Sequence, residues 1–137
     1  MTNIANLFNF ISSKKPEYMA PLKFKLLHDP ESITNDDLIV KGNLNLYKTP
    51  ITSLPDNLTV EGYIDLRYTK TTSLPDNLTV GGGINLYDTP ISSIPNNLIV
   101  GSDIYLANTP LSQKYSKDEI LKMIQDKGGS VKGNITI

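Results

Sequence analysis

Apolar and polar positions recur along this chain with a fixed period of 20 residues. Between Ile33 and Ser112 the pattern runs without a gap, and the segment 54–60, LPDNLTV, returns unchanged at 74–80 and as IPNNLIV at 94–100. A constant period of this size is typical of solenoids, in which each repeat packs mainly against the repeats before and after it. The chain is therefore predicted to be a repeat solenoid.

Each repeat contains the pattern of a short strand followed by a turn. In residues 64–66 an apolar, a polar and an apolar residue alternate, which indicates a strand with one buried face. A Thr-Pro pair follows the strand in several repeats, and proline cannot donate to a strand ladder. Residues 95–97 then predict a turn before aliphatic residues re-enter the core. Strands of successive coils should pair in parallel, and each aliphatic side chain buried between coils contributes roughly 1.5–3 kcal/mol.

One column of the repeat holds threonine in every copy, at Thr49, Thr69, Thr89 and Thr109. A backbone group enclosed by a bend has to find a hydrogen-bond partner. We therefore expect these hydroxyls to form a ladder along the stack, each one bonded to the backbone of the next coil.

The less regular ends of the chain carry weaker copies of the same pattern. A shift of 20 residues places Phe24 and Leu26 in strand columns, so the segment 22–26 is predicted to form a first strand. The segment 131–137 follows the pattern of 100–106 and is predicted to add a last strand. The expected architecture is a parallel sheet of about six short strands along one flank of the solenoid.

Helices are predicted at both ends of the solenoid. Ser116 followed by Glu119 is a capping box, an apolar stripe follows it, and two glycines at 128–129 end the helix. Near the N-terminus, apolar residues recur at helical spacing from Ile4 to Ile11. Solenoids need such end pieces because an open coil exposes core and unpaired strand edges. The predicted organisation is an N-terminal helical cap (1–19), a solenoid (20–115), and a C-terminal capping helix with the final strand (116–137).

The wording of the repeat resembles a known class of protein. Leu-Pro-x-x-Leu, followed by Ile64, Leu66 and Thr71 and then by Leu74-Pro75, resembles the short, 20-residue class of leucine-rich repeats found in effector proteins of Gram-negative pathogens. It is closer still to small repeat proteins of bacteriophages, which have no uniform function. The resemblance implies a leucine-rich-repeat-like solenoid that recognises a partner on its exposed strand face, and it carries over no catalytic residue.

The chain also departs from that class. Thr69 and its equivalents stand where the family has a buried asparagine ladder, and a glycine precedes the strand at Gly42, Gly62 and Gly82. The ubiquitin-ligase domain that accompanies the effector repeats needs a catalytic cysteine, and this chain contains no cysteine. Enzymatic activity is therefore not expected.

Composition narrows the range of partners and compartments. Thirteen basic and fourteen acidic residues give a net charge of −1, so the chain lacks the excess of positive charge that is typical of nucleic-acid-binding proteins. The lack of cysteine excludes disulfides, thiol catalysis and thiolate metal sites. The apolar runs are too short to span a bilayer, and residues 1–13 lack the pattern of a secretory signal. We expect a cytoplasmic protein, residing in the host cytosol if it is phage-encoded, with no membrane partner and no cofactor.

Other candidate sites have simpler interpretations. His28 is the only histidine and falls in a turn-like segment, which favours a structural or solvated role. The glycines at 81–83 look like a phosphate loop, but they precede a strand instead of following one into a helix. Asp36, Asp56 and Asp76 recur 20 residues apart and are more typical of turn residues than of calcium ligands. No metal site is predicted.

Aromatic residues gather at the outward strand positions and immediately beside them. Five of the seven tyrosines and the only arginine lie there, and these two residue types are enriched in interface hot spots. The alternative is that tyrosine pads an exposed sheet because of its strand propensity. The predicted partner-binding surface consists of Tyr47, Tyr63, Asp65, Arg67, Tyr68, Asn85, Tyr87, Asp103 and Tyr105.

These observations favour a non-enzymatic protein-binding scaffold. It would act as a phage- or effector-like inhibitor of a host protein, such as a component of a bacterial defence system. The alternative is a structural part of a larger assembly, such as a virion or fibre, joined through the solenoid ends. Closed ends would favour the binder and an uncovered terminal strand the structural part. The partner is expected to be a protein, and the chain itself a monomer or a weak homodimer.

Overall fold

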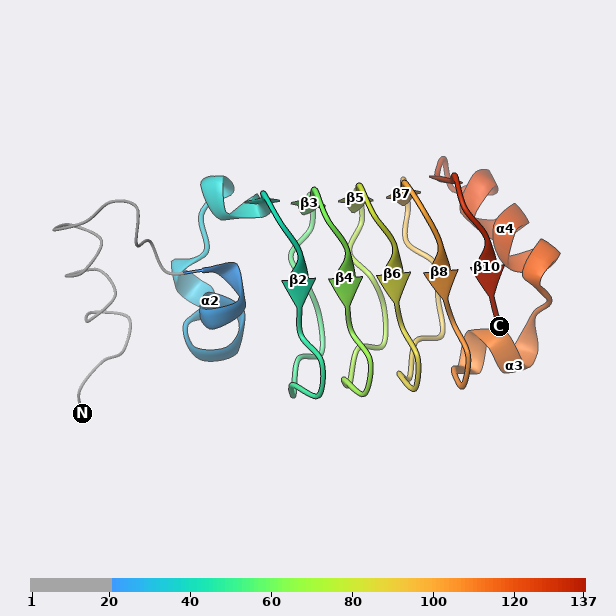
Figure 1. The fold of residues 1–137 in the computed structure, drawn as a ribbon, viewed down its shortest axis with the longest axis horizontal. Helices are drawn as coiled ribbons and strands as arrows, with labels where there is room; N and C mark the ends of the chain where they lie inside the picture. The colour runs from blue at the N-terminus through green and yellow to red at the C-terminus, as the bar shows by residue number, and fades with distance from the viewer. Residues whose placement is uncertain (1–20) are drawn as a thin grey trace, which may run out of the picture.

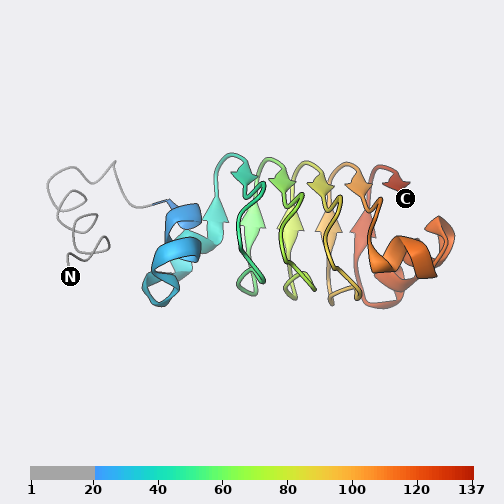
Figure 2. The ribbon, with the colours of Figure 1, turned by 90° about the horizontal axis from the view of Figure 1, so that it is seen from below.

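A β-solenoid makes up most of the part of the chain that the structure describes, residues 21–137. The computed structural model stacks the 20-residue repeats as successive coils along one axis, with helices at both ends (Figure 1). The view turned by 90° shows strands on two flanks of the stack (Figure 2). The predicted solenoid of parallel strands is confirmed. The helix predicted within residues 1–19 lies outside the described residues.

Each coil carries two strands of two residues, so the stack has two parallel sheets. The first sheet has the order β1-β3-β5-β7-β9, and the second has the order β10-β8-β6-β4-β2. The strands of the first sheet are β1 (Ile39–Val40), β3 (Thr59–Val60), β5 (Thr79–Val80), β7 (Ile99–Val100) and β9 (Ser130–Val131). Those of the second are β2 (Leu44–Asn45), β4 (Ile64–Asp65), β6 (Ile84–Asn85), β8 (Ile104–Tyr105) and β10 (Ile135–Thr136). The sequence pattern pointed to the second sheet alone, with one strand more than it has.

Strand pairing follows the repeat. Ile64 pairs with Ile84 and Ile84 with Ile104, always in parallel. After the C-terminal excursion, Ile135 takes the next place beside Ile104. The last strand predicted within residues 131–137 is therefore confirmed, in the expected register.

Aliphatic columns fill the space between the two sheets. Leu66 and Leu86 follow strands of the second sheet, Leu58 and Leu78 precede strands of the first, and all four are at most 1% exposed. Because each coil supplies the same columns, the core runs without interruption along the solenoid axis. Each coil can bury its aliphatic side chains only against its neighbours, so stability belongs to the stack rather than to any single repeat.

The threonine column does not form the predicted ladder between coils. Each hydroxyl instead donates to a carbonyl oxygen in its own coil, from Thr69 Oγ1 to Leu66 O at 2.7 Å and from Thr89 Oγ1 to Leu86 O at 2.9 Å. The residue before each threonine explains this. Tyr68, with φ of 58°, is in the left-handed region and turns the chain back toward the carbonyl of Leu66, the residue after β4. The threonines therefore close the corner of each coil.

Asparagine side chains form the ladder that links the coils. Asn77 Nδ2 donates to Asn57 Oδ1, and Asn97 Nδ2 donates to Asn77 Oδ1, both at 2.8 Å. All three have φ between 57° and 65°, a region that asparagine tolerates better than most residues. Beside them, Asp56 Oδ1 accepts a hydrogen bond from the Asp76 N–H at 3.1 Å. These two aspartates are turn residues, as predicted, and the described part of the chain contains no cluster of three or more His, Cys, Asp or Glu that could hold a metal ion.

The predicted first strand is wrong, because Leu22–His28 form the helix α2. This segment, LKFKLLH, contains no β-branched residue, and its leucines at 22 and 26 fall on one face of a helix. Leu22 is buried and Leu26 packs against the core. Two short 3-10 helices, η2 (Pro30–Ser32) and η3 (Asn35–Leu38), then lead into β1.

An ion pair connects α2 to the helix η3 at the start of the solenoid. Lys25 Nζ donates to Asp37 Oδ2 in η3 at 2.8 Å. Burial alone would raise the pKa of Asp37, but hydrogen bonds from Lys25 and Thr34 and the charge of Lys25 lower this pKa below its ordinary value. The carboxylate is therefore held in its charged form where the helix meets the first coil.

The C-terminal excursion forms the predicted cap. It consists of α3 (Pro110–Lys114) and α4 (Lys117–Asp126), and α4 begins with the expected capping box of Ser116 and Glu119. Gly128, with φ of 83°, follows the end of α4.

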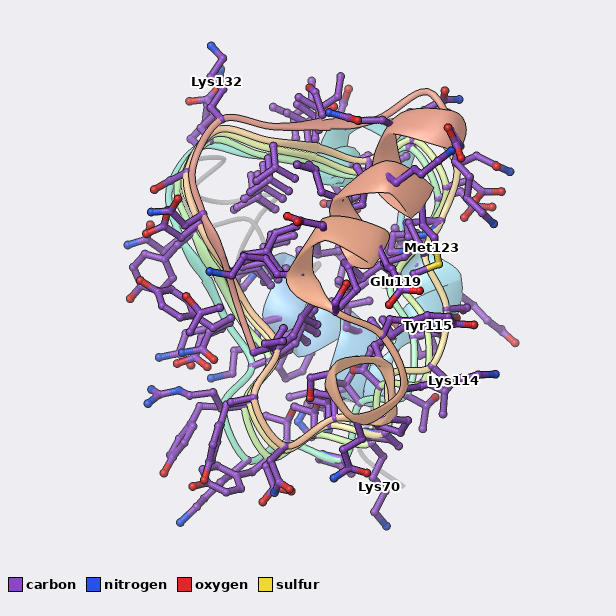
Figure 3. The ribbon with its side chains drawn as sticks, turned by 90° about the vertical axis from the view of Figure 1, so that its right-hand side faces the viewer. Lys70, Lys114, Tyr115, Glu119, Met123 and Lys132 are labelled. Carbon is purple, nitrogen blue, oxygen red and sulfur yellow. The ribbon has the colours of Figure 1, made fainter. Side chains whose placement is uncertain are left out.

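Helix α4 closes this end of the core. Figure 3 views the molecule along the solenoid axis and shows α4 lying across the coil, with Glu119 and Met123 on it. Ile120 and Ile124 point inward and are fully buried. The apolar stripe of the helix thus covers the aliphatic columns that the last coil would otherwise expose.

Candidate functional site

The outer face of the second sheet collects the exposed aromatic residues of the solenoid. Its five tyrosines are between 37% and 45% exposed, namely Tyr47, Tyr63, Tyr68, Tyr87 and Tyr105. Tyr47, Tyr63, Tyr87 and Tyr105 project outward because side chains at alternate positions of an extended segment point to the same face. Tyr68 instead projects from the left-handed turn that follows β4. The tyrosines of the predicted surface therefore do lie on one face.

Three of these tyrosines, Tyr47, Tyr68 and Tyr87, form a tyrosine row across successive coils. The ring centroids of Tyr47 and Tyr68 are 5.7 Å apart and those of Tyr68 and Tyr87 are 5.5 Å apart, with interplanar angles of 78° and 79°. This edge-to-face arrangement is one that aromatic pairs prefer. Burial between the neighbouring rings, together with nearby ionisable groups, raises the pKa of Tyr68. The row is a preformed apolar ridge whose rings hold one another in place.

Arg67 is held against this row by a buried carboxylate. Its Nε lies 3.0 Å from Asp65 Oδ1, its Nη2 lies 2.7 Å from Asp65 Oδ2, and its guanidinium lies over the Tyr47 ring at 4.7 Å from the centroid. The residue Asp65 is only 5% exposed, so it is not the accessible polar contact that its outward position suggests. Burial would raise the pKa of Asp65, but the hydrogen bonds and charge of Arg67 lower it. Asp65 therefore serves to fix the orientation of Arg67.

A shallow hollow of about 380 Å³ opens beside this ion pair. Tyr63, Gly83, Asn85 and Tyr105 are among the residues that line it. Its remaining lining includes Asp65, Arg67, Ser102 and Asp103. We call it the Gly83 hollow. A second hollow of about 340 Å³ shares Arg67, Asn85 and Tyr105 with it and reaches Tyr68 and Tyr87.

The predicted residues thus fall into two adjoining groups. Tyr47, Tyr68 and Tyr87 make the tyrosine row, while the other six surround the Gly83 hollow: Tyr63, Asp65, Arg67, Asn85, Asp103 and Tyr105. The sequence interpretation missed Gly83 itself, which it treated only as part of a weak phosphate-loop pattern. Alignment of the repeats could have identified it, because Gly83 lacks a side chain at the position where the two preceding coils have Asn43 and Tyr63.

Other chemistry in the described region is sparse. The His28 ring packs against the Phe24 ring, with centroids 4.9 Å apart. No helix between residues 21 and 137 is long and apolar enough to cross a membrane.

The fold and this surface define a repeat β-solenoid with one aromatic face. The chain matches no protein-family model, no curated protein and no solved structure.

Proposed function

We propose that this protein is a non-enzymatic scaffold that binds a protein partner on the outer face of the second sheet. The observation that carries the proposal is the concentration of five exposed tyrosines and an ion-paired arginine on that single face. Tyrosine and arginine supply a large share of the binding energy in protein interfaces, because they combine apolar area with a polar group.

The order already present in this surface supports the proposal. The rings of the tyrosine row pack against one another, and Arg67 is oriented by Asp65 before any partner arrives. Association loses free energy when flexible side chains are immobilised, roughly 0.5–1.5 kcal/mol for each one. A surface whose anchors are already fixed avoids part of that loss.

The C-terminal end of the solenoid core supports side-on binding over assembly into a fibre. Helix α4 covers the C-terminal end with Ile120 and Ile124 fully buried. A protein that extended a fibre through its ends would be expected to leave a terminal coil open. The alternative role, as a structural part of a virion or other assembly, would use the free edges of β9 and β10, each of which has a single neighbour in its sheet.

The resemblance to phage and effector repeats suggests a more specific version of the proposal. In that version the partner is a host protein, such as a component of a bacterial defence system, and the solenoid inhibits it by covering part of its surface. The protein would act in the cytoplasm, as a monomer or weak homodimer.

Affinity capture from bacterial lysate, followed by mass spectrometry, tests this proposal. The informative variant combines Tyr47→Ala with Tyr87→Ala, which removes the outer rings of the tyrosine row and leaves the Arg67–Asp65 pair intact. The matched control combines Ile99→Ala with Lys132→Ala, two exposed positions of the other flank. We expect a protein that is retained by the wild type and the control and lost from the tyrosine variant. A partner that the tyrosine variant retains unchanged would contradict the proposal.

A further inference from the structure

Three backbone amides beside the Gly83 hollow, those of Gly83, Ser102 and Asp103, lack the partner that equivalent amides have in other coils of the described chain. Asn43 Oδ1 accepts a hydrogen bond from the Tyr63 N–H at 3.0 Å. In the same column, Asp103 Oδ1 accepts one from the Asn134 N–H at 2.7 Å. In both cases a side-chain oxygen of one coil satisfies the backbone of the next.

The two coils between these positions break the pattern. Tyr63 precedes Gly83 in the column, and Gly83 precedes Asp103, so neither coil supplies a carboxamide or carboxylate oxygen to the next. Among residues 21–137, the N–H groups of Gly83 and Asp103 donate no hydrogen bond. Both residues are half-buried, and a backbone N–H without an acceptor in the protein is free to donate to a bound group. The hollow is therefore a place where an acceptor from outside can bind.

Position 83 does not readily accept a side chain whose oxygen could bind the Asp103 N–H, as Asn43 Oδ1 binds the Tyr63 N–H. A Cβ atom added to Gly83 would lie 2.7 Å from the backbone oxygen of Asp103, closer than real contacts allow. The glycine thus keeps the hollow open and leaves the Asp103 N–H facing it. Asn85, which also lines the hollow, adds a further donor, because its Oδ1 accepts from the Tyr87 N–H at 3.1 Å while its amide NH2 donates to no residue of the described chain.

Charge decides which kind of acceptor fits. Arg67 is neutralised by Asp65, so the remaining formal charge in the lining is the carboxylate of Asp103. A second anion beside Asp103 would be repelled, and this repulsion is stronger where water is partly excluded. A neutral acceptor meets no such repulsion, and one that also carries an N–H can donate to Asp103 Oδ2, which otherwise has only a long contact of 3.4 Å from the Tyr105 hydroxyl.

We propose that the Gly83 hollow is a subsite for a neutral carboxamide, the side chain of an asparagine or glutamine on the protein partner. Its oxygen accepts from the Asp103 N–H, as Asn43 Oδ1 does from the Tyr63 N–H, and its NH2 group donates to Asp103 Oδ2. Tyr63 and Tyr105 enclose the apolar stem of that side chain. This inference rests on the proposed function and specifies the chemistry of the partner.

Hydrogen exchange followed by NMR tests the geometry without any ligand. The amides of Tyr63 and Asn134 should be protected by their side-chain acceptors, whereas those of Gly83 and Asp103 should exchange at least about tenfold faster. The variant Tyr63→Asn provides an internal check, because it places a carboxamide where Asn43 stands one coil earlier. It should slow exchange at Gly83 and leave Asp103 unchanged. Equal protection of all four amides in the wild type would overturn the proposal.

Titration with small blocked amino acids tests the subsite. The probes are N-acetyl-glutamine methylamide, the leucine derivative as an apolar match and the glutamate derivative as a charged match, each added at neutral pH to labelled protein. We expect a saturable downfield shift of the Asp103 amide proton with the glutamine probe, none with leucine, and at least about threefold weaker binding of glutamate. In Asp103→Asn, which keeps a side-chain oxygen for Asn134, the glutamate probe should bind about as well as glutamine.

The outcomes separate this inference from the proposed function. A glutamine probe that causes no saturable shift at Asp103, or that behaves like the leucine probe, overturns the carboxamide subsite even if a partner is captured through the tyrosine row. A glutamate probe that binds the wild type more tightly would overturn the charge argument and identify an anion subsite. The probe experiment uses neither Tyr47 nor Tyr87, so loss of the tyrosine-row proposal would leave its result standing.

Discussion

The two sheets of this solenoid share one backbone plan and differ in the chemistry of their outer faces. Both consist of parallel two-residue strands paired at the same spacing along the chain. The outward residues of the first sheet are Ile39, Thr59, Thr79, Ile99 and Ser130, without an aromatic residue among them. The second sheet and its margin carry five exposed tyrosines. If strand propensity alone placed tyrosine, both sheets should have received it.

The inward residues, which build the core, can therefore be distinguished from the outward residues, which form the two surfaces. The inward columns are nearly constant on both flanks, because every coil has to fill the same interior. The charged groups near the first sheet form only a loose pair, with 3.5 Å between Lys41 Nζ and Glu61 Oε2 and both side chains well exposed. Near the second sheet, Arg67 and Asp65 make a close, oriented pair beside aromatic rings. The second face is therefore the more ordered of the two.

A break in the shared core should weaken both faces together and have the largest effect. Leu78 is fully buried between the sheets, so Leu78→Ala should lower the free energy of unfolding by about 2–5 kcal/mol. Urea denaturation gives the total loss. Hydrogen exchange should show faster opening in β5 and β6 alike, and an effect confined to one sheet would argue against a common core.

The two ion pairs should differ strongly in their contribution to stability. Arg67→Ala leaves Asp65 buried without its partner and should cost about 1–2 kcal/mol, discounted for the exposed side of Arg67. Lys41→Ala should cost less than about 0.5 kcal/mol. The folded pKa of Asp65 is lowered, so its stabilisation is complete above the unfolded value of about 3.9 and is lost as pH falls through the folded value.

Urea titrations at several pH values check this pair of variants. The gap between wild type and Arg67→Ala should be constant near neutral pH and shrink below about pH 4, as Asp65 becomes protonated. A gap that grew on acidification, or an equal effect of Lys41→Ala, would show that the second face is not the more ordered one.

The asparagine ladder should matter about equally to both flanks, because it links three successive coils through the turns that lead into the first sheet. Asn77→Ala loses two side-chain hydrogen bonds and puts a Cβ residue without local hydrogen bonding at φ of 60°, so it should cost about 1–2 kcal/mol. Asn77→Gly loses the same bonds but accepts that φ, and should cost less. Thermal unfolding of the two variants compares them. A glycine variant as unstable as the alanine variant would remove backbone strain from the explanation.

The smallest expected effect belongs to a tyrosine placed on the other sheet. Thr79 lies at an outward, half-buried position of β5 in the first sheet, where tyrosine suits a strand as well as threonine does. Thr79→Tyr should therefore change the free energy of unfolding by less than about 0.5 kcal/mol in urea denaturation. A loss above about 1.5 kcal/mol would mean that the fold itself excludes tyrosine there, and the contrast between the faces would lose its functional meaning.

The sequence predicted the features that the repeat propagates from coil to coil. The parallel pairing, the last strand and the capping box at Ser116 all followed from column alignment or from a local motif. The segment 22–26 matched two columns and still folded as a helix, because short apolar runs do not distinguish helix from strand. The first sheet was missed although residues 58–60 alternate like residues 64–66, because this segment was interpreted only as the return of the chain to the core after a turn.

The details of the site depended on contacts that a period cannot reveal. A column shows that Thr69 recurs, but the left-handed turn at Tyr68 decides which carbonyl its hydroxyl reaches. An outward strand position suggests that Asp65 is exposed, yet the side chain of Arg67 lies over it. The positions of the tyrosines were predictable, whereas the Gly83 hollow emerges only from the missing side chain together with its neighbours in space.

The affinity of the captured partner for two matched variants tests the central claim most directly. Calorimetry or surface binding would compare Tyr47→Ala with Tyr87→Ala, on the aromatic face, against Ile99→Ala with Lys132→Ala, on the opposite flank. Two hot-spot rings lost together should raise Kd by at least about 100-fold, while the control should change it by less than about threefold. An equal effect of both pairs, or a larger effect of the control, would contradict the assignment of the binding surface to the second sheet.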